Sequence, residues 1–385
     1  MLGCQRALFD IPHDISYLNA AGWSPLPLAT MAAAREAVSR KGQPWRIDAD
    51  FASQQHERAR RAAAALIHAS ADDVALVSSV SYGVATAAKI IDIPRGSRVL
   101  LMQDDHSSPA LEWLGRAERQ GFTAETIARP ADFDWTAAIL EAIERPGAPP
   151  IALASISNVN WSDGCLVDMA PVQVALRRQG AGLLVDATHG AGVLDLDVSK
   201  LDPDFVVFPT YKWLLGPYGR AFLYVAERHQ NGVPLEQTSA ARRGVRAEHS
   251  VYFADTRYVT DARRFDMGER DHFISLEMAA MGMELMASWG AAAVAGRLRS
   301  LTDRLAEGLS GLAVDLATRA VRTPHVLGVG FPGGMPADLV ARMAEQKVYA
   351  APRLGRLRIS PHVYNDDADI DRCVGVLGRL LPRRT

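Results

Sequence analysis

Lysine is scarce in this chain. The 42 lysine and arginine residues include only five lysines, at positions 41, 89, 200, 212 and 347. Four of them have polar or helical neighbours that are typical of solvated surface, whereas Lys212 lies in the apolar and aromatic run PTYKWLLGPYG. An ammonium group can lose its proton in a dry site, and a guanidinium cannot, so Lys212 is a candidate amine nucleophile. A lysine that reaches water from a buried strand end is the alternative.

Cysteine is also scarce. The three cysteines, Cys4, Cys165 and Cys373, are odd in number and far apart, which argues against a disulfide framework. None of them forms a CxxC pair, and none of the ten histidines forms an HExxH pair. We therefore expect no metal site.

Neither a charge excess nor a long apolar run is present. The formal net charge is −2, which gives no reason to expect nucleic acid or an anionic membrane as a partner. No apolar run is long enough to span a bilayer, and the start, MLGCQRALFDIPHD, lacks the basic and apolar regions of a signal peptide. With 48% hydrophobic and 22% charged residues, we expect a globular protein. Because no signal peptide is recognised, we expect it in the cytoplasm.

Short apolar runs alternate with longer helical patterns through the first 230 residues. The predicted strands cover residues 73–79, 97–103, 151–157, 182–188 and 204–210. Continuous apolar runs are typical of strands buried on both faces of a parallel sheet, so an α/β doubly wound domain is predicted. The run RAFLYVAER, 220–228, follows too closely for a crossover helix and suits an antiparallel strand.

The second part of the chain has a different texture. Residues 236–250 are polar and predicted to be a loop, and a long helical stretch is predicted from Ile274 to Leu312. The end of the chain reads strand, helix, strand, helix, which suits a smaller α+β lobe. Because 385 residues exceed one ordinary core, we expect two lobes, a large domain (21–240) and a small domain (241–385), with a short N-terminal segment (1–20) before them.

Several predicted strands end in polar side chains. Asp186 ends one strand and is followed by His189, Lys212 follows Asp186 by 26 residues, His106 follows another strand, and Ser81 lies in a strand-to-helix turn. Strand ends of such a sheet meet at a crevice, and a helix N-terminus there binds anions. An amine, a carboxylate and an anion site are what pyridoxal phosphate needs, since lysine binds its aldehyde as a Schiff base.

Together with YLNAAG, NVNWSDG and LRISPHVYN, these motifs resemble the class V aminotransferase family of fold-type-I pyridoxal phosphate enzymes. That family includes cysteine desulfurases, kynureninases and isopenicillin N epimerase-like proteins, and the resemblance covers nearly the whole chain. It implies a large domain with a mostly parallel seven-stranded sheet and a smaller α+β C-terminal domain. It also implies a homodimer in which the partner chain completes the phosphate site.

The resemblance assigns roles to individual residues. Lys212 would bind the cofactor aldehyde and Asp186 the pyridine nitrogen, while the other cofactor contacts would be His189 (phenolic oxygen), His106 (ring stacking) and Ser81, Thr210 and Tyr211 (phosphate). Substrate would meet Asn19, Trp161 and Arg358, the last pairing with its α-carboxylate. Ordinary readings remain open: Asp186 and the serines as caps, His189 as a core residue, His106 as a solvated helix start, and Arg353 or Arg356 in place of Arg358.

The implied reaction begins on an α-amino acid, with Schiff base exchange and removal of the α-proton by Lys212. We expect an aminotransferase first. A C–S or C–C β-lyase of kynureninase type and an amino-acid epimerase are the alternatives. Because residues 328–356 hold no cysteine to serve as a thiol nucleophile, a persulfide-forming cysteine desulfurase is not expected. A catalytically idle binding protein would have no need of Lys212.

Overall fold

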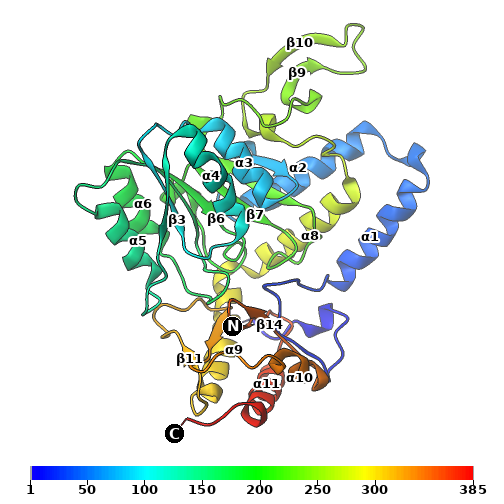
Figure 1. The fold of residues 1–385 in the computed structure, drawn as a ribbon. Coiled ribbons are helices and arrows are strands. Elements are labelled where there is room, and N and C mark those ends of the chain that lie inside the picture. The colour runs from blue at the N-terminus through cyan, green and yellow to red at the C-terminus, as the bar shows by residue number, and fades with distance from the viewer. Residues whose placement is uncertain (1, 385) are drawn as a thin grey trace.

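A seven-stranded sheet forms the centre of the larger part of the molecule (Figure 1). The computed structural model describes residues 2–384. The strands lie in the order β2 (Val74–Val77), β8 (Ala221–Val225), β7 (Phe205–Pro209), β6 (Gly182–Asp186), β5 (Ile151–Ser157), β3 (Arg98–Met102) and β4 (Thr123–Ile127). β8 runs antiparallel to both β2 and β7, and the other neighbours are parallel. The predicted mostly parallel sheet and its antiparallel strand are confirmed.

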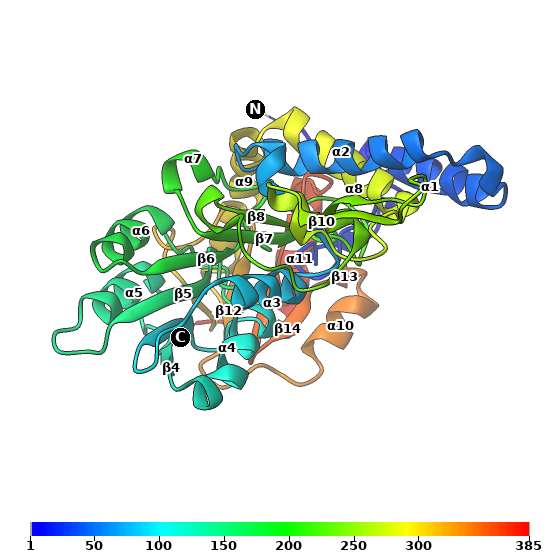
Figure 2. The same cartoon turned by 90° about the horizontal axis from the view of Figure 1, so that it is seen from above.

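Helices cover both faces of this sheet (Figure 2). One face packs against α3 (Val80–Ile90) and α4 (Ser107–Gln120). The other packs against α2 (Ala49–Ala65), α5 (Trp135–Glu144), α6 (Met169–Arg178), α7 (Val198–Leu201) and α8 (Phe273–Trp289). In β6, Leu184 belongs to the first cluster and Leu183 and Val185 to the second. Side chains alternate across a strand, so covering both faces requires continuous apolar runs.

A second, four-stranded antiparallel sheet builds the smaller part of the molecule. Its order is β11 (Asp315–Leu316), β12 (Leu327–Gly330), β15 (Arg356–Ile359) and β14 (Ala351–Arg353). It is accompanied by α9 (Ala291–Leu309), α10 (Leu339–Glu345) and α11 (Asp367–Leu380). The N-terminal β1 (Ser16–Tyr17) pairs with β13 (Val348–Tyr349) beside it. The domain boundaries at 20 and 240 stay predictions. Helix α8 follows residue 240 in the chain but packs on α2 and on α1 (Leu28–Lys41) of the larger part.

One prediction about the second part of the chain is wrong, and another is refined. The stretch 236–250 is not all loop, because β9 (Arg242–Val245) pairs with β10 (Phe253–Tyr258) in a hairpin that projects from the body (Figure 1). The hairpin is largely exposed, so no apolar alternation marks it. The predicted helical stretch from Ile274 to Leu312 is helical over most of its length, but Gly290, with a φ of 78°, divides it into two helices, α8 and α9. Among residues 2–384, no single helix is long and apolar enough to cross a membrane.

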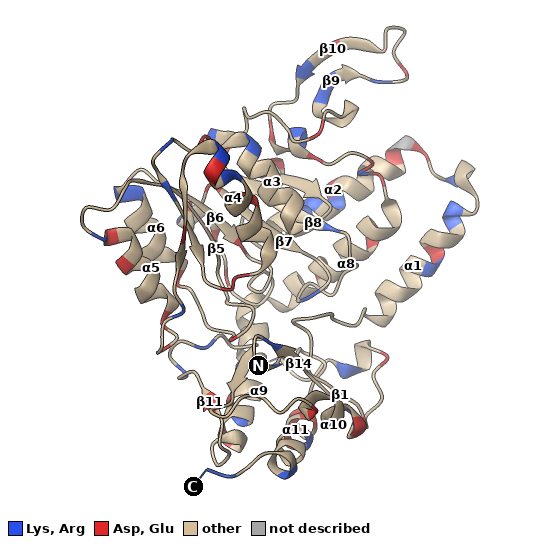
Figure 3. Cartoon of the chain, in the orientation of Figure 1, with Lys and Arg blue, Asp and Glu red and all other residues tan. Residues whose placement is uncertain are grey.

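Arginines carry most of the positive charge, and both signs are spread over the fold (Figure 3). Two buried arginines show how the interior accommodates a guanidinium. Arg60 makes a bidentate pair with the buried Asp266, with N–O distances of 3.0 and 2.8 Å. Arg6 pairs with Asp369 at 2.8 Å. A buried cation without such a carboxylate is therefore informative, because burial of an unpaired charge costs free energy.

Candidate active site

The carboxyl ends of four strands meet at one edge of the large sheet. Ser157 at the end of β5 lies beside Asp186 at the end of β6, and Asp186 lies beside Val207 in β7. Pro209 and Val77, near the ends of β7 and β2, both face Ala221 of β8. This register brings together the Ser79–Ser81 turn, Asp186 and the loop that carries Lys212, as parallel topology predicts.

The amine of Lys212 is buried against His189. Its Nζ lies 3.1 Å from Nε2 of His189, and the residue is only 6% exposed. Burial, helped by the charge of Arg358, lowers the pKa of Lys212 to about 7. Burial and the charge of Lys212 also hold the pKa of His189 well below its usual value, so its imidazole is neutral. Lys212 is therefore a free amine at mildly basic pH, which is what a nucleophile or base requires.

Asp186 is a buried acid that makes no ion pair with any described residue. It is 2% exposed, and its Oδ1 accepts a hydrogen bond from the Thr188 N–H at 2.9 Å. Within residues 2–384, no lysine, arginine or histidine forms an ion pair with it. Burial raises the pKa of Asp186, and the Thr188 hydrogen bond opposes that shift. Such a carboxylate lacks only a cationic hydrogen-bond donor.

Arg358 is the complementary case, a buried cation without an anion. It is 1% exposed, and its Nη1 donates to the Trp161 carbonyl oxygen at 2.9 Å. Its Nε and Nη2 have no hydrogen-bond partner. The guanidinium of its rival Arg356 lies 4.7 Å from the Phe133 ring, and Arg353 is only half-buried. A guanidinium with two free nitrogens suits a carboxylate, so the geometry favours Arg358 among the three arginines.

Trp161, His106 and Asn19 lie around this arginine. The His106 ring meets the Trp161 ring edge-on, with centroids 5.7 Å apart. The Trp161 indole donates to the Asp104 carbonyl at 2.7 Å, which fixes its orientation. Asn19 pairs with Ser360, two residues after Arg358, and its buried Oδ1 has no partner. Trp161 is thus in contact with Arg358, and the Asn19 backbone pairs just beyond the end of β15, while substrate contacts by these residues and ring stacking by His106 stay predictions.

The residues predicted to hold a phosphate fall into two groups. Ser79 caps α3 by accepting from the Tyr82 N–H, and its Oγ lies 3.0 Å from that of Ser81, beside the free N–H groups of the helix. Thr210 instead donates its hydroxyl to the Pro217 carbonyl at 2.7 Å, which closes the lysine loop. The Tyr211 ring lies 5.5 Å from the Lys212 amine. Phosphate contacts by Ser81, Thr210 and Tyr211 stay predictions.

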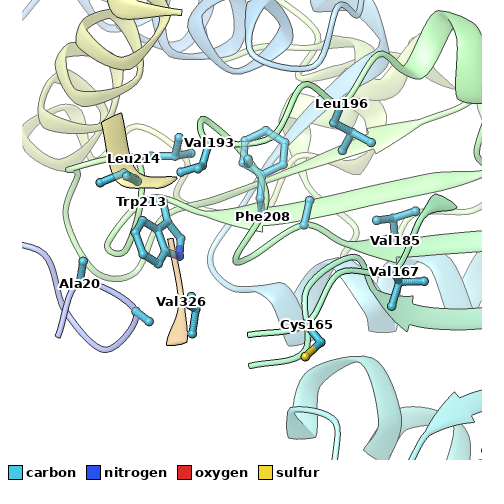
Figure 4. Packing of buried hydrophobic residues seen from close by; sticks show 14 of the residues in the cluster. Ala20, Cys165, Val167, Val185, Val193, Leu196, Phe208, Trp213, Leu214 and Val326 are labelled. Carbon is cyan, nitrogen blue, oxygen red and sulfur yellow. The ribbon is translucent and has the colours of Figure 1, made fainter. Parts of the chain in front are cut away.

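Sequence reasoning missed the side chains behind His189. The Trp213 indole donates to His189 Nδ1 at 3.1 Å, and the His325 ring meets Trp213 edge-on at 4.4 Å. His362 accompanies them, with Nε2 3.2 Å from the Trp213 carbonyl. Figure 4 shows the Trp213 indole among apolar side chains that include Leu214 and Val326. A tryptophan in an apolar run reads as core, and only the run's position beside Lys212 hinted at more.

These residues fit pyridoxal phosphate. Asp186 lacks a cation, which a protonated pyridine nitrogen supplies, and the N-terminus of α3 offers N–H groups for a phosphate. Lys212 supplies an amine of low pKa for the aldehyde, and Arg358 is left free for a carboxylate.

The family model described as Aminotransferase class-V matches residues 16–373. The chain belongs to the class V aminotransferase family. It is an enzyme of that family, and pyridoxal phosphate is its cofactor.

Three relatives show the range of activities in this class V family. A probable cysteine desulfurase of Pyrococcus abyssi is 24% identical over 86% of this chain and 84% of its own. Isopenicillin N epimerase of Streptomyces clavuligerus is 27% identical over 84% of both chains. Kynureninase of Deinococcus radiodurans is 24% identical over 99% of this chain and 93% of its own. The desulfurase relative means that the comparisons give no support to the expected exclusion of that activity.

The fold is shared with solved members of the class V family. The structure of a cysteine desulfurase from Thermococcus onnurineus NA1 superposes with a TM-score of 0.83 at 21% identity, covering 98% of this chain and 97% of that one. The predicted fold-type-I architecture is confirmed.

Proposed function

We propose that this class V enzyme acts on an α-amino acid, which Arg358 binds by its α-carboxylate and from which Lys212 removes the α-proton. The observation that carries the proposal is the free, buried Nε and Nη2 of Arg358 in a site that also holds the low-pKa amine of Lys212. Burial is the largest cause of the lowered Lys212 pKa and the charge of Arg358 is the next, so the two groups interact electrostatically within the site.

Four residues of the site have distinct roles in this chemistry. Bound pyridoxal phosphate supplies an electron sink for the negative charge left when the α-proton departs. Lys212 would hold the cofactor through its amine. Once that amine is freed from the cofactor, it would accept the α-proton of the substrate. Asp186 holds the ring nitrogen in its protonated form, and the neutral His189 offers an N–H beside the Lys212 amine. Arg358 orients the substrate, so that one bond at the α-carbon faces the base.

Among the reactions that can follow, we propose transamination. Lys212 is a single base that can return the proton at another carbon, and transamination needs no other catalytic group. The properties of the cysteines favour transamination over persulfide transfer. Burial raises the pKa of Cys373 to about 12, burial also raises that of Cys165, and Cys4 lies at the surface with its Sγ 3.4 Å from the Tyr364 carbonyl. A thiol nucleophile needs the opposite shift.

The test is a screen of amino acids scored in parallel for keto acid, released thiol or sulfide, ammonia and stereoinversion. Formation of keto acid with amino transfer to a keto acid acceptor supports the proposal. Elimination products or inversion without keto acid would instead assign a lyase or an epimerase.

Arg358→Leu tests the carboxylate site separately. Loss of a charge-assisted bidentate pair predicts a fall in kcat/KM of roughly tens- to thousands-fold, mainly through KM, with cofactor still bound. Arg358→Lys is expected to recover only part of it, because a point charge cannot reproduce the fork. Arg356→Leu is the matched control on the same strand. A larger loss from Arg356→Leu than from Arg358→Leu would move the carboxylate site.

We also propose that the enzyme works as a homodimer. Support comes from large apolar side chains left exposed, namely Trp45 at 78%, Phe253 at 66% and Tyr218 at 62%. Phe253 lies on the hairpin of β9 and β10, which projects from the body of its own chain (Figure 1), and β10 is mostly exposed. Phe253 follows Val251 and Tyr252, which are also exposed, and a contiguous apolar patch of this kind marks an interaction surface. Light scattering at working concentration checks the mass, and an active monomer would refute the proposal.

A further inference from the structure

A second arginine approaches the substrate end of the site from strand β14. In the pairing of β14 with β15, Arg353 lies opposite Arg356, and Ala351 lies opposite Arg358. Directly opposed residues of an antiparallel pair point to the same face, and so do residues two apart on one strand. Arg353 therefore projects from the same sheet face as Arg358.

Trp161 connects the two arginines. The Cζ atom of Arg353 lies 5.9 Å from the centre of the Trp161 ring. The carbonyl oxygen of the same tryptophan accepts the hydrogen bond from Arg358 Nη1 at 2.9 Å. The two guanidinium groups thus meet one residue, whose ring also contacts His106.

Neither guanidinium is neutralised by the protein. In the part of the chain that the structure describes, no carboxylate pairs with Arg353 or Arg358, and Arg353 donates only to its neighbour, the Pro352 carbonyl, at 2.7 Å. The nearby acids Asp104 and Asp163 both face Arg129 instead. These two acids are therefore directed at Arg129, and neither of them neutralises Arg353 or Arg358.

The two charges act on each other. Burial lowers the pKa of Arg358 to about 9, and the charge of Arg353 adds to that shift. The charge of Arg353 also contributes to the lowered pKa of Lys212. A substrate with one carboxylate would neutralise Arg358 and leave Arg353 uncompensated next to it. A substrate with two anionic groups would neutralise both cations, which lowers the cost of placing them together.

We propose that Arg353 is the binding site for a second anionic group, so that the substrate is an α-amino acid with an acidic side chain. This inference rests on the proposed function, because it takes Arg358 as the site of the α-carboxylate. Arg353 is half-buried, and its guanidinium carbon lies 5.9 Å from the centre of the Trp161 ring. Cation–π contact with that ring holds the guanidinium in place without satisfying its N–H groups.

The test measures binding without turnover. Calorimetry on the holoenzyme compares the binding of α-methylaspartate with that of α-methylasparagine, and the binding of α-methylglutamate with that of α-methylglutamine. These compounds have no α-proton, and each acid matches its amide in size. Wild-type enzyme is expected to bind at least one acid roughly ten- to hundred-fold more tightly than its amide, the range for a hydrogen bond to a charged group. Arg353→Gln is expected to remove that preference and leave the amide affinity unchanged.

Two variants make the outcome specific. Arg356→Gln is the matched control, because Arg356 lies opposite Arg353 but has its guanidinium over Phe133, and it should keep the preference for the acid. Arg358→Gln should weaken acid and amide alike. Equal binding of acid and amide by the wild type, or an equal loss of both in Arg353→Gln, would overturn the second anion site and leave the proposed function intact. If neither class binds to the wild type, the proposed function falls, and this inference falls with it.

Discussion

Trp213 fixes the protonation pattern of His189. The indole N–H of Trp213 points at Nδ1 of His189 over 3.1 Å. An indole nitrogen is only a donor, so Nδ1 is the acceptor, and the neutral imidazole carries its proton on Nε2. Nε2 lies 3.1 Å from the Lys212 amine and faces the site. His189 is thus held as a hydrogen-bond donor at the place where the cofactor's oxygen is expected.

Trp213→Phe tests this positioning role. The change keeps an aromatic ring but removes the donor, so both tautomers of His189 become accessible. We expect kcat to fall by roughly ten-fold or more with KM little changed, since a hydrogen bond to a buried group is worth about 1–3 kcal/mol. Nitrogen NMR of the imidazole should show the loss of the single tautomer.

The matched control is Trp113→Phe. Trp113 is equally buried and belongs to the hydrophobic cluster on the other face of the sheet. Its indole nitrogen has no hydrogen-bond partner among the described residues. This variant should lower stability without changing kcat or the imidazole spectrum. A Trp213→Phe enzyme with an unchanged tautomer would show that another contact sets the proton on His189.

The reactivity of Lys212 should depend on pH with a midpoint near 7. Its pKa is lowered to about 7 by burial and by Arg358, so below that pH the group is an unreactive ammonium and above it a free amine. In enzyme stripped of cofactor, labelling by pyridoxal phosphate and borohydride should rise through pH 7 at Lys212, as read by peptide mapping.

Lys200 and Lys212→Ala serve as controls for that labelling. Lys200 is exposed and ion-paired with Asp197, and this pair raises its pKa. It should label only at much higher pH, and Lys212→Ala should lose both the label and turnover. Cofactor found chiefly on another lysine would refute the assignment of Lys212.

The central part of the site was predictable because its residues follow buried strands. Apolar runs mark β6 and β7, and parallel topology then brings Asp186, His189 and Lys212 to one edge. Local patterns were enough for this.

Other features depend on contacts that no local pattern encodes. The hairpin of β9 and β10 is exposed, so its strands lack the apolar period by which strands are found. The break between α8 and α9 had one local signal, the single Gly290 between two helical stretches, and a glycine alone does not decide whether a helix ends. His325 joins the site by placing Nε2 2.5 Å from the His189 carbonyl, across 136 residues of sequence. Such a pairing requires the three-dimensional fold.

Asp186→Asn should separate cofactor binding from catalysis. An amide of the same shape still accepts a hydrogen bond but no longer stabilises a protonated ring nitrogen. We expect cofactor to remain bound, as read by absorbance, and exchange of the substrate α-proton for deuterium to slow roughly a hundred-fold or more, the range for loss of a preorganised electrostatic contact.

Asp204→Asn is the control for that measurement. Asp204 is also buried and accepts from the Leu183 N–H at 2.8 Å, but it lies at the opposite end of β6 and β7. Its loss should lower stability and leave the exchange rate of bound substrate near the wild-type value. Fast exchange in Asp186→Asn would show that the reaction does not need the charge at this position.

Two helical glycines should respond in opposite ways to alanine. Gly282 of α8 packs directly on the lysine loop, where a Cβ atom would overlap the carbonyl oxygen of Leu214 and approach that of Leu215. Leu215 already has a φ of 54°, so the loop has little freedom to retreat. A Cβ atom added at Gly296 of α9 would have no neighbouring side chain or segment within 4 Å.

Gly296→Ala should therefore stabilise the enzyme, because alanine favours a helix over glycine by about 1 kcal/mol. Gly282→Ala gains the same helix preference but overpacks the interface, which costs about 1–3 kcal/mol, so its melting temperature should fall below that of Gly296→Ala. The displaced loop carries Lys212, and cofactor affinity should fall in Gly282→Ala alone. Equal melting temperatures and equal cofactor affinities in the two variants would mean that α8 does not set the position of the lysine.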